Sequence, residues 1–513
     1  MIDPQTPVLV GVGQAVDRWR GEATDSAPGP VGMAVRAATA ALDDTGVAEI
    51  AASIGRVVVI RTMTDSLSTS GGPFGRCANP PGTVAARLGI AGASHVYPVT
   101  GGDQPQALVA EAAAAVHSGE ARAVLIASGE ATAAAKVAGR AGLALNWTDS
   151  ADGDFEDRGF GTMLLTPYEI ANGLGMPVTT YPVFEHALRA RLGFDRAAWR
   201  ARMAAVLAPM SDVAAGNPYS QFPVSRSAAF LARESAENYA VADPYLKWHV
   251  AQDAVNQGAA VIVTTVGEAT ARGIDPGKFV YLHGHAELAD APVMQRPDLS
   301  LSRAFEGAVG LALEASRKSG AEMAHLDLYS CFPCAVELGA AALGIDPVAR
   351  ATTVTGGLPF FGGPGNSYSL HAIATMAEWL RADRAAFGLV LANGGFLSKA
   401  AVGVYSATAP EDWQPVSCVA AQRDLYATDL PDPLSSDGEG VIESYTMTMA
   451  KGLPSAAAIV VRTPAGRMLA RVNPDDLGEL KARDPIGAPV TIRSNEGHNT
   501  VSAIGAAATS RRD

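Results

Sequence analysis

The sequence predicts an α/β protein made of two related halves, a helical insertion and a small β-barrel-like domain at the C-terminus. Two stretches, 99–130 and 356–399, each read as a glycine-rich loop, a helix and a buried apolar strand. From 131 to about 257 the pattern changes to scattered glycine and proline with helical segments. Past about 407, short alternating segments separated by turns are typical of a small barrel.

The repeated unit is the reason to expect two related halves. In 356–399 the loop GGLPFFGGPGN precedes a helix, and the apolar run 387–392 then ends in Asn-Gly-Gly. The stretch 99–130 has the same order, with its strand at 123–127. Repetition at this distance indicates a duplicated fold. The alternative is that any doubly wound sheet repeats such units.

The elements of the first half surround an insertion, and together they form the predicted domain 1–265. The continuous apolar run 7–13 is typical of a strand buried on both faces. The other predicted strands are 56–62, 94–99, 123–127 and 258–265, and the helices outside the repeat are 31–42 and 83–88. Within the insertion, 131–257, we predict helices at 183–192, 196–208 and 225–238.

The second half, 266–407, repeats this order, and 408–513 forms a separate β domain. The half contains predicted strands at 279–283, 325–329, 387–392 and 401–405, with helices at 300–318 and 335–343 besides the one in the repeat. The predicted strands of the tail are 441–449, 456–463, 467–472, 490–493 and 500–504.

Composition restricts the classes of partner. The chain has 513 residues and a formal net charge of -13, which argues against nucleic acid or an anionic membrane as the main partner. A local basic patch for a phosphorylated ligand stays compatible with this charge. We find no signal peptide and no apolar run long enough to enter a membrane. We therefore expect a cytoplasmic protein whose four cysteines are reduced.

Three short motifs carry a resemblance to a known family. They are GGLPFFGGP at 356–364, DLYSCF at 327–332 and ANGG at 392–395. Together with the opening PVLVGVG and the duplicated halves, they resemble the thiolase superfamily from about residue 7 to 407. The motifs lie at that family's GG-x4-GHP, Asn-Glu-Ala-Phe or His-Asp-Cys-Phe, and Cys-x-Gly loops. The chain is most similar to the actinobacterial thiolase-like proteins of type 1, which carry an additional C-terminal domain.

The resemblance implies coenzyme A chemistry but not the usual catalytic set. Thiolases are acyltransferases of lipid metabolism that use a nucleophilic cysteine, a histidine and a second cysteine on coenzyme A thioesters. Here Gly101 or Gly102 stands at the nucleophile, Gly363 at the histidine and Ala392 at the second cysteine. We therefore expect coenzyme A or acyl-CoA as ligand, without ordinary thiolase activity. A homodimer or a protein partner, through the thiolase face or the C-terminal domain, is left open.

Five side chains are candidates for catalysis. Tyr329 and Tyr368 resemble the tyrosines that thiolase-like aldolases carry in these loops, although Tyr329 also fits a half-buried aromatic residue at a strand end. Cys331 matches the cysteine of His-Asp-Cys-Phe, and a zinc site is not expected because its Cys-x-x-Cys pair lacks a second ligand pair. His371 fits a structural histidine better than a catalytic one. Asn393 fits either a donor to a thioester oxygen or a turn residue.

The glycine loops supply the candidates for binding coenzyme A. Asp103 is expected to cap the following helix. Asn366, like Asn393, fits either a donor to a thioester oxygen or a turn residue. Three functions remain open: acyl-CoA binding without covalent catalysis, aldol-type carbon–carbon cleavage by Tyr329, and a non-catalytic coenzyme A-binding or partner-assembly module. The full set of loop candidates is Gly101, Gly102, Asp103, Gly363, Asn366 and Gly394.

Overall fold

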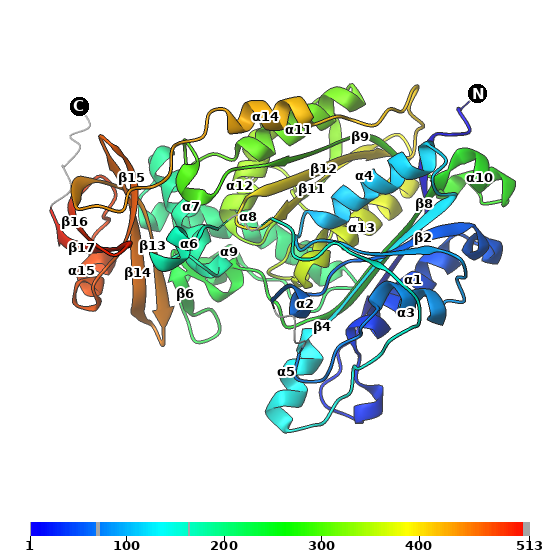
Figure 1. Cartoon of the computed structure of the whole chain (residues 1–513), viewed down its shortest axis with the longest axis horizontal. Coiled ribbons are helices and arrows are strands. Elements are labelled where there is room, and N and C mark those ends of the chain that lie inside the picture. The colour runs from blue at the N-terminus through cyan, green and yellow to red at the C-terminus, as the bar shows by residue number, and fades with distance from the viewer. Residues whose placement is uncertain (1, 68–71, 163–164, 506–513) are drawn as a thin grey trace.

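Two sheets lie on either side of a pair of central helices, α4 (Gln104–His117) and α13 (Tyr368–Ala382). The structure is a computed structural model, and it describes residues 2–67, 72–162 and 165–505. Both central helices contact both sheets, and their buried faces share one apolar cluster with strands of each sheet. Further helices cover the outer faces, so helical layers and sheets alternate through the body (Figure 1).

The strand order confirms the predicted duplication. The first sheet runs β1-β8-β4-β2-β3-β5 and the second β9-β12-β11-β10. In each half the first two pairings are antiparallel and the third is parallel, so β1-β8-β4-β2 matches β9-β12-β11-β10. The strands are β1 (Pro7–Val16), β2 (Ile54–Val59), β3 (Ser94–Tyr97), β4 (Ala123–Ala131), β5 (Glu156–Asp157), β8 (Asn256–Thr265), β9 (Tyr281–Ala289), β10 (Met323–Leu328), β11 (Phe387–Gly394) and β12 (Lys399–Ser406).

The outer helices also correspond between the halves. Helix α1 (Pro30–Asp44) packs on β1, β4 and β8, and α11 (Arg303–Ser316) packs on β9 and β12. Helix α3 (Pro80–Arg87) covers β2, and α12 (Pro333–Ala342) lies against β10. Two short helices, α2 (Met63–Leu67) and α10 (Val266–Ala271), follow β2 and β8.

The insertion is helical as predicted, but one predicted helix is wrong. Of 225–238 only α9 (Ala228–Ala232) is helical, because the Asn238 side-chain amide folds back and donates to the carbonyl groups of Phe230, Leu231 and Arg233. Two other helices are longer than predicted, because each accommodates an internal proline. The elements are α5 (Thr132–Ala141), α6 (Pro167–Ala171), α7 (Pro177–Arg191), α8 (Arg196–Gly216), β6 (Ala240–Asp243) and β7 (Tyr245–Leu246).

The C-terminal strands close into the predicted five-stranded barrel. The order is β13-β14-β15-β17-β16, and β13 pairs with both β14 and β16 to close it. The β15–β17 pairing is parallel, and a helix separates β15 from β16, which is the topology of an OB-fold. The elements are β13 (Gly438–Ala450), β14 (Leu453–Thr463), β15 (Gly466–Arg471), α15 (Leu477–Ala482), β16 (Pro489–Asn495) and β17 (His498–Ile504).

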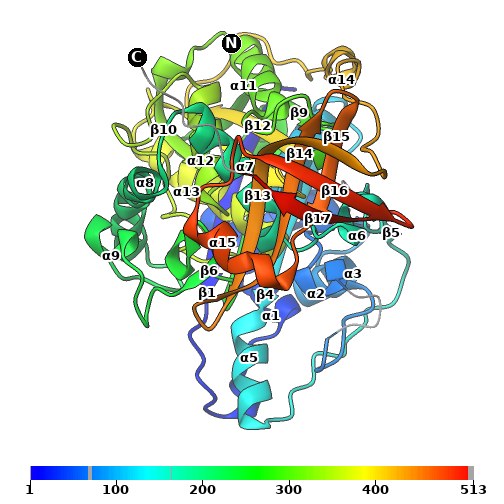
Figure 2. The same ribbon diagram turned by 90° about the vertical axis from the view of Figure 1, so that its left-hand side faces the viewer.

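The barrel is joined to the insertion by hydrogen bonds and apolar packing. Strand β13 pairs with β6 and packs on α7, which lies behind the barrel in Figure 2. The Tyr445 ring stacks on His186 at 3.9 Å, and its hydroxyl donates to Asp243 at 2.6 Å. Val460 and Leu469 of the barrel belong to the same apolar cluster as α7. The barrel and the insertion thus share one packed interface. The domain boundaries at 265 and 407 stay a prediction.

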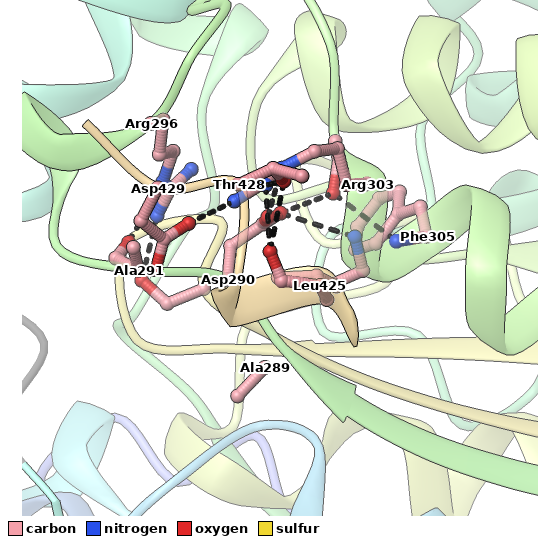
Figure 3. Close-up of polar contacts among 12 residues, drawn as sticks. Ala289, Asp290, Ala291, Arg296, Arg303, Phe305, Leu425, Thr428 and Asp429 are labelled. Carbon is pink, nitrogen blue, oxygen red and sulfur yellow. Dashed lines mark hydrogen bonds and ion pairs between the residues drawn. The ribbon is translucent and has the colours of Figure 1, made fainter. Parts of the chain in front are cut away.

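The segment between the second half and the barrel is clamped onto the body, as Figure 3 shows. Arg303 donates to Leu425 O at 2.9 Å and to Asp429 Oδ1 at 2.6 Å, just beyond α14 (Val419–Tyr426). The Gln422 amide of α14 pairs with both backbone groups of Ala289 at 2.7 and 2.8 Å. The linker thus covers part of the exposed edge of β9.

A buried carboxyl at the end of β4 gives a pH-dependent contribution to stability. Glu130 is 1% exposed, accepts a hydrogen bond from Met63 N at 2.6 Å, and burial raises its pKa to about 8. The folded state therefore keeps the Glu130 proton at pH values where the unfolded chain has lost it. Stability then falls as the pH rises from the unfolded pKa of 4.5 to about 8, by about 1.4 kcal/mol for each pH unit.

We expect Glu130→Gln to remove this slope, because the amide keeps the acceptor oxygen and cannot ionise. Urea unfolding at pH 5 and pH 8 measures the change, with the difference between variant and wild type isolating this group from all others. Parallel pH dependences in the two proteins would contradict the assignment.

Among the described residues, no helix combines the length and apolarity needed to cross a bilayer.

Candidate functional site

Four loops that are distant in the sequence meet where the two halves join. They are the turn before α4, the loop after β10, the turn after β11, and the loop 356–364 before α13. Ser369 Oγ at the start of α13 donates to Gly102 O at 3.2 Å, and Asn393 Nδ2 lies 3.6 Å from Cys331 Sγ. The three motifs and the first glycine loop, which the sequence separates widely, thus form one site.

The Tyr329 hydroxyl occupies the space beside Gly102. A Cβ atom at Gly102 would lie 2.4 Å from Tyr329 Oη and 2.5 Å from Asn393 O, so this position has no room for a side chain. Tyr329 is 6% exposed, and its hydroxyl makes no hydrogen bond to another described residue. Burial raises the pKa of Tyr329 well above its ordinary value, so the phenol stays protonated and can donate to a ligand.

The Asp103 carboxyl lies between the two glycine turns. Its Oδ1 atom would be 2.0 Å from a Cβ at Gly101 and 1.8 Å from a Cβ at Gly394. The predicted helix cap is wrong: Asp103 stands at the N-cap position, but its backbone is already helical and its side chain makes no capping hydrogen bond. Oδ2 accepts from Gln104 Nε2 at 2.8 Å, whereas buried Oδ1 lacks a partner among the described residues.

Asn393 and Cys331 are linked through a tyrosine of the insertion. Asn393 Nδ2 donates to Tyr181 Oη at 2.9 Å, and Leu397 N donates to the same oxygen at 3.0 Å. The Tyr181 ring stacks on Phe332 at 4.2 Å. Burial raises the pKa of Cys331 to about 12, so its sulfur is a thiol rather than a thiolate at neutral pH. Sequence reasoning missed Tyr181, because a tyrosine in an apolar helix reads as core.

Tyr368 borders the site, but its hydroxyl is engaged elsewhere. It lies 2.5 Å from Thr355 Oγ1, which in turn donates to buried Asp327 at 3.0 Å. Asp327 also accepts from Thr353 and from backbone groups of the same loop. The Tyr368 ring meets the Tyr329 ring edge-on at 5.5 Å. Tyr368 thus supports the loop and the Tyr329 ring.

Three further candidates make their contacts away from Gly102 and Tyr329. His371 is fully buried, its Nδ1 lies 2.8 Å from Gln14 Oε1, and burial lowers its pKa to about 3, which keeps the ring neutral. Asn366 donates to Arg61 O at 2.8 Å and to Ser66 Oγ at 2.9 Å. Gly363 faces the insertion, where a Cβ would meet Ala251 Cβ at 3.3 Å.

Two cations lie on an aromatic ring that adjoins the loop 356–364. The Arg226 guanidinium carbon is 3.6 Å from the centroid of Trp248, and Lys247 Nζ is 4.8 Å from it. Trp248 stacks on Phe360 of this loop at 6.2 Å. Neither cation forms an ion pair with a carboxylate in the described ranges; Arg226 donates to Val224 O at 2.8 Å, and the Glu237 carboxylate acts on it electrostatically. We call Arg226, Lys247 and Trp248 the cation patch; the sequence did not predict it, because nothing local pairs Arg226 with the tryptophan.

Within the described residues, no cluster of histidine, cysteine and carboxylate side chains is arranged to hold a metal ion. The four cysteines are free thiols.

The chain is similar to solved structures of the predicted superfamily. A monomeric SCP2-thiolase-like protein type 1 from Mycobacterium smegmatis is 34% identical with a TM-score of 0.83, over 98% of this chain and 99% of that chain. Human mitochondrial 3-ketoacyl-CoA thiolase is 14% identical with a TM-score of 0.57, over 79% of this chain and 100% of that chain. The Ltp2–ChsH2(DUF35) aldolase is 16% identical with a TM-score of 0.55, over 79% of this chain and 98% of that chain.

The last two likenesses show the fold alone. No protein-family model matches the chain, and none of the curated proteins matches it. The likeness to the mycobacterial protein spans both chains almost completely, including the barrel. The chain therefore belongs to the family of SCP2-thiolase-like proteins of type 1, within the thiolase superfamily.

Proposed function

We propose that the protein binds acyl-CoA thioesters in the four-loop site and does not carry the acyl group on its own side chains. The observation that carries this proposal is the arrangement at Gly102, where the Tyr329 hydroxyl fills the space that a nucleophilic side chain would need. The thiols near the site support the same conclusion, because buried Cys331 has a raised pKa and a thiol is a poor nucleophile.

The polar groups of the site suit a thioester carbonyl. A protonated Tyr329 is a hydrogen-bond donor without a partner among the described residues. Asn393 Nδ2 already donates to Tyr181 Oη and to Cys331 Sγ, so it holds these groups in place and leaves Tyr329 as the donor for a ligand. Donors in a water-poor site stabilise negative charge that develops on a thioester oxygen. This arrangement supports enolate chemistry rather than acyl transfer.

A second candidate function is aldol-type carbon–carbon cleavage on an acyl-CoA. It is favoured by the unengaged Tyr329 hydroxyl, with Tyr368 holding the ring edge-on. Retro-aldol cleavage produces a thioester enolate, which the same donor would stabilise. The remaining alternative is a non-catalytic coenzyme A-binding module with the barrel as docking domain. It would bind coenzyme A in the same way but would not turn over an acyl-CoA.

We assign the nucleotide end of coenzyme A to the cation patch. In an acidic protein of net charge -13, two cations without carboxylate partners suit a phosphorylated ligand. The patch adjoins the loop 356–364 through Phe360, and Ala251 N donates to Cys331 O at 3.0 Å, so this part of the insertion is continuous with the site.

We expect Arg226→Ala to weaken coenzyme A binding about tenfold or more, because charge-assisted hydrogen bonds contribute roughly 1.5–3 kcal/mol. Titration calorimetry with coenzyme A measures the change. Arg493→Ala, which removes an arginine of the barrel paired with Asp437 at 2.7 Å, is the matched control. Pantetheine lacks the nucleotide, so its affinity should be the same in all three proteins. Equal coenzyme A affinity of Arg226→Ala and wild type would remove the cation patch from the proposal.

A further inference from the structure

We propose that Asp103 is the general base of the four-loop site and removes a proton from the α-carbon of the bound thioester. This inference rests on the proposed function, since it assigns a reaction step to the same ligand. The carboxyl lies in the loop before α4, between two glycines, and next to the residue whose side-chain space Tyr329 fills.

The unpaired oxygen of Asp103 is the first part of the argument. Asp103 is 6% exposed, and its Oδ1 accepts no hydrogen bond among the described residues. Leaving a buried polar atom unsatisfied costs about 1–3 kcal/mol, and more for a charged group. Its Oδ2 has only the neutral Gln104 amide. The buried structural carboxyl of Asp327 also has an unpartnered Oδ1, but its Oδ2 accepts four hydrogen bonds, whereas the Asp103 carboxyl accepts one from another side chain.

The second part is the space made for this oxygen by two separate loops. A Cβ at Gly101 or at Gly394 would meet Oδ1 at 2.0 or 1.8 Å, so both residues must be glycine for the carboxyl to lie here. Gly101 and Gly394 belong to different halves of the chain. The geometry of a single local turn therefore does not explain why both residues leave space for Oδ1. One glycine from each half of the chain thus leaves the space that the Asp103 carboxyl occupies.

The surroundings of Asp103 make it a stronger base than an ordinary aspartate. Burial raises its pKa, and the Lys399 ammonium of β12 opposes this shift. The Asp103 charge in turn contributes to the raised pKa values of Glu287 on β9 and of Tyr329, after burial as the main cause. A carboxylate with a raised pKa is a stronger base than an ordinary one, and the matching of pKa to working pH favours general base catalysis.

The step is a simple proton transfer. The Asp103 carboxylate takes a proton from the α-carbon, and the electrons of that C–H bond form the carbon–carbon double bond of the enolate. The negative charge moves to the thioester oxygen, which accepts a hydrogen bond from Tyr329. Return of the proton from Asp103 regenerates the thioester, and in deuterium oxide it returns a deuteron.

Proton exchange tests the step without knowledge of the natural substrate. Wild type and variants are incubated with acetyl-CoA in deuterium oxide, and loss of the methyl proton signal is followed by NMR. We expect Asp103→Asn to lower the exchange rate at least 100-fold, because the amide keeps the shape and cannot accept the proton. Glu130→Gln, which alters a buried carboxyl outside the site, is the matched control and should exchange like wild type.

The pH profile separates a base from a structural carboxyl. The wild-type rate should rise with pH and level off above the raised pKa of Asp103, whereas the residual rate of Asp103→Asn should lack this step. Asp103→Glu should recover part of the rate. Acetyl-CoA binding and melting temperature are measured for every variant, so that misfolding is recognised.

Each outcome is decisive. Acetyl-CoA binding without exchange by wild type would overturn the role of Asp103 and leave the proposed function standing. Exchange that is unchanged in a folded Asp103→Asn variant would also overturn it. If wild type binds no acetyl-CoA, the proposed function fails and this inference fails with it. If Asp103→Asn unfolds, wild-type exchange with the expected pH step and partial recovery by Asp103→Glu supports the role, and absence of either rejects it.

Discussion

Replacing Tyr329 by phenylalanine is expected to lower the rate of acetyl-CoA proton exchange by about 10²–10⁴-fold. The change removes the hydroxyl next to Gly102 and keeps the ring that packs edge-on against Tyr368. Without the phenol, the developing enolate oxygen loses its donor, and transition-state stabilisation by such donors is worth several kcal/mol. Binding of acetyl-CoA should change much less, since the cation patch that we propose for the nucleotide is unaltered.

Two neighbouring substitutions are the controls for Tyr329→Phe. Cys331→Ser changes little volume and should leave exchange within a few-fold, because the buried thiol is protonated. Tyr368→Phe removes a hydroxyl whose hydrogen-bond partner is Thr355, so it should cost stability more than rate. Equal exchange by Tyr329→Phe and wild type would remove the phenol from the chemistry. An inactive Cys331→Ser variant would restore a cysteine mechanism.

Replacing Gly394 by alanine is expected to destabilise the protein by roughly 1–3 kcal/mol or more. The new methyl group would lie 1.8 Å from Asp103 Oδ1 and 2.8 Å from Asp103 Cγ, so the carboxyl or the turn must move. Urea unfolding followed by circular dichroism measures the loss. Combining Gly394→Ala with Asp103→Ala should recover most of it, since the clashing atoms are gone and the nearest remaining neighbour is Asp103 N at 3.3 Å.

A glycine in open space is the control for Gly394→Ala. Gly478 lies in helix α15, and a Cβ there would have no neighbour within 4 Å. Gly478→Ala should therefore be neutral or stabilising, as for glycine to alanine in helices generally. A Gly394→Ala variant as stable as wild type would contradict the crowding around Asp103, as would a double variant no better than the single one.

The sequence was most informative where local pattern and chain topology agree. The apolar runs and glycine loops predicted the two halves, and the matching order of β1-β8-β4-β2 and β9-β12-β11-β10 confirms them. Alternation and turns predicted the barrel, which closes through β13. The predicted helix 225–238 was wrong because the Asn238 side chain competes for the carbonyls of 230, 231 and 233, an interaction that hydrophobic periodicity does not encode.

The sequence predicted which loops form the candidate site but not the contacts between their side chains. Gly102, Tyr329, Asn393 and Gly394 come together, as the motifs indicated. The role of Asp103 was misread, because an aspartate before a helix usually caps it, and only the spatial approach of Gly394 shows where its oxygen lies. Tyr181 and Arg226 were missed, since they belong to the insertion and reach the site or its border through long-range packing.

The most direct test of the central claim is to look for an acyl-enzyme while binding is demonstrated. The protein is titrated with acetyl-CoA by calorimetry, and the same mixture is analysed by intact-protein mass spectrometry. We predict saturable binding and no acetyl adduct, because Tyr329 fills the space beside Gly102 and the nearby Cys331 is a buried thiol. A stoichiometric, thiol-linked acetyl adduct would contradict the account.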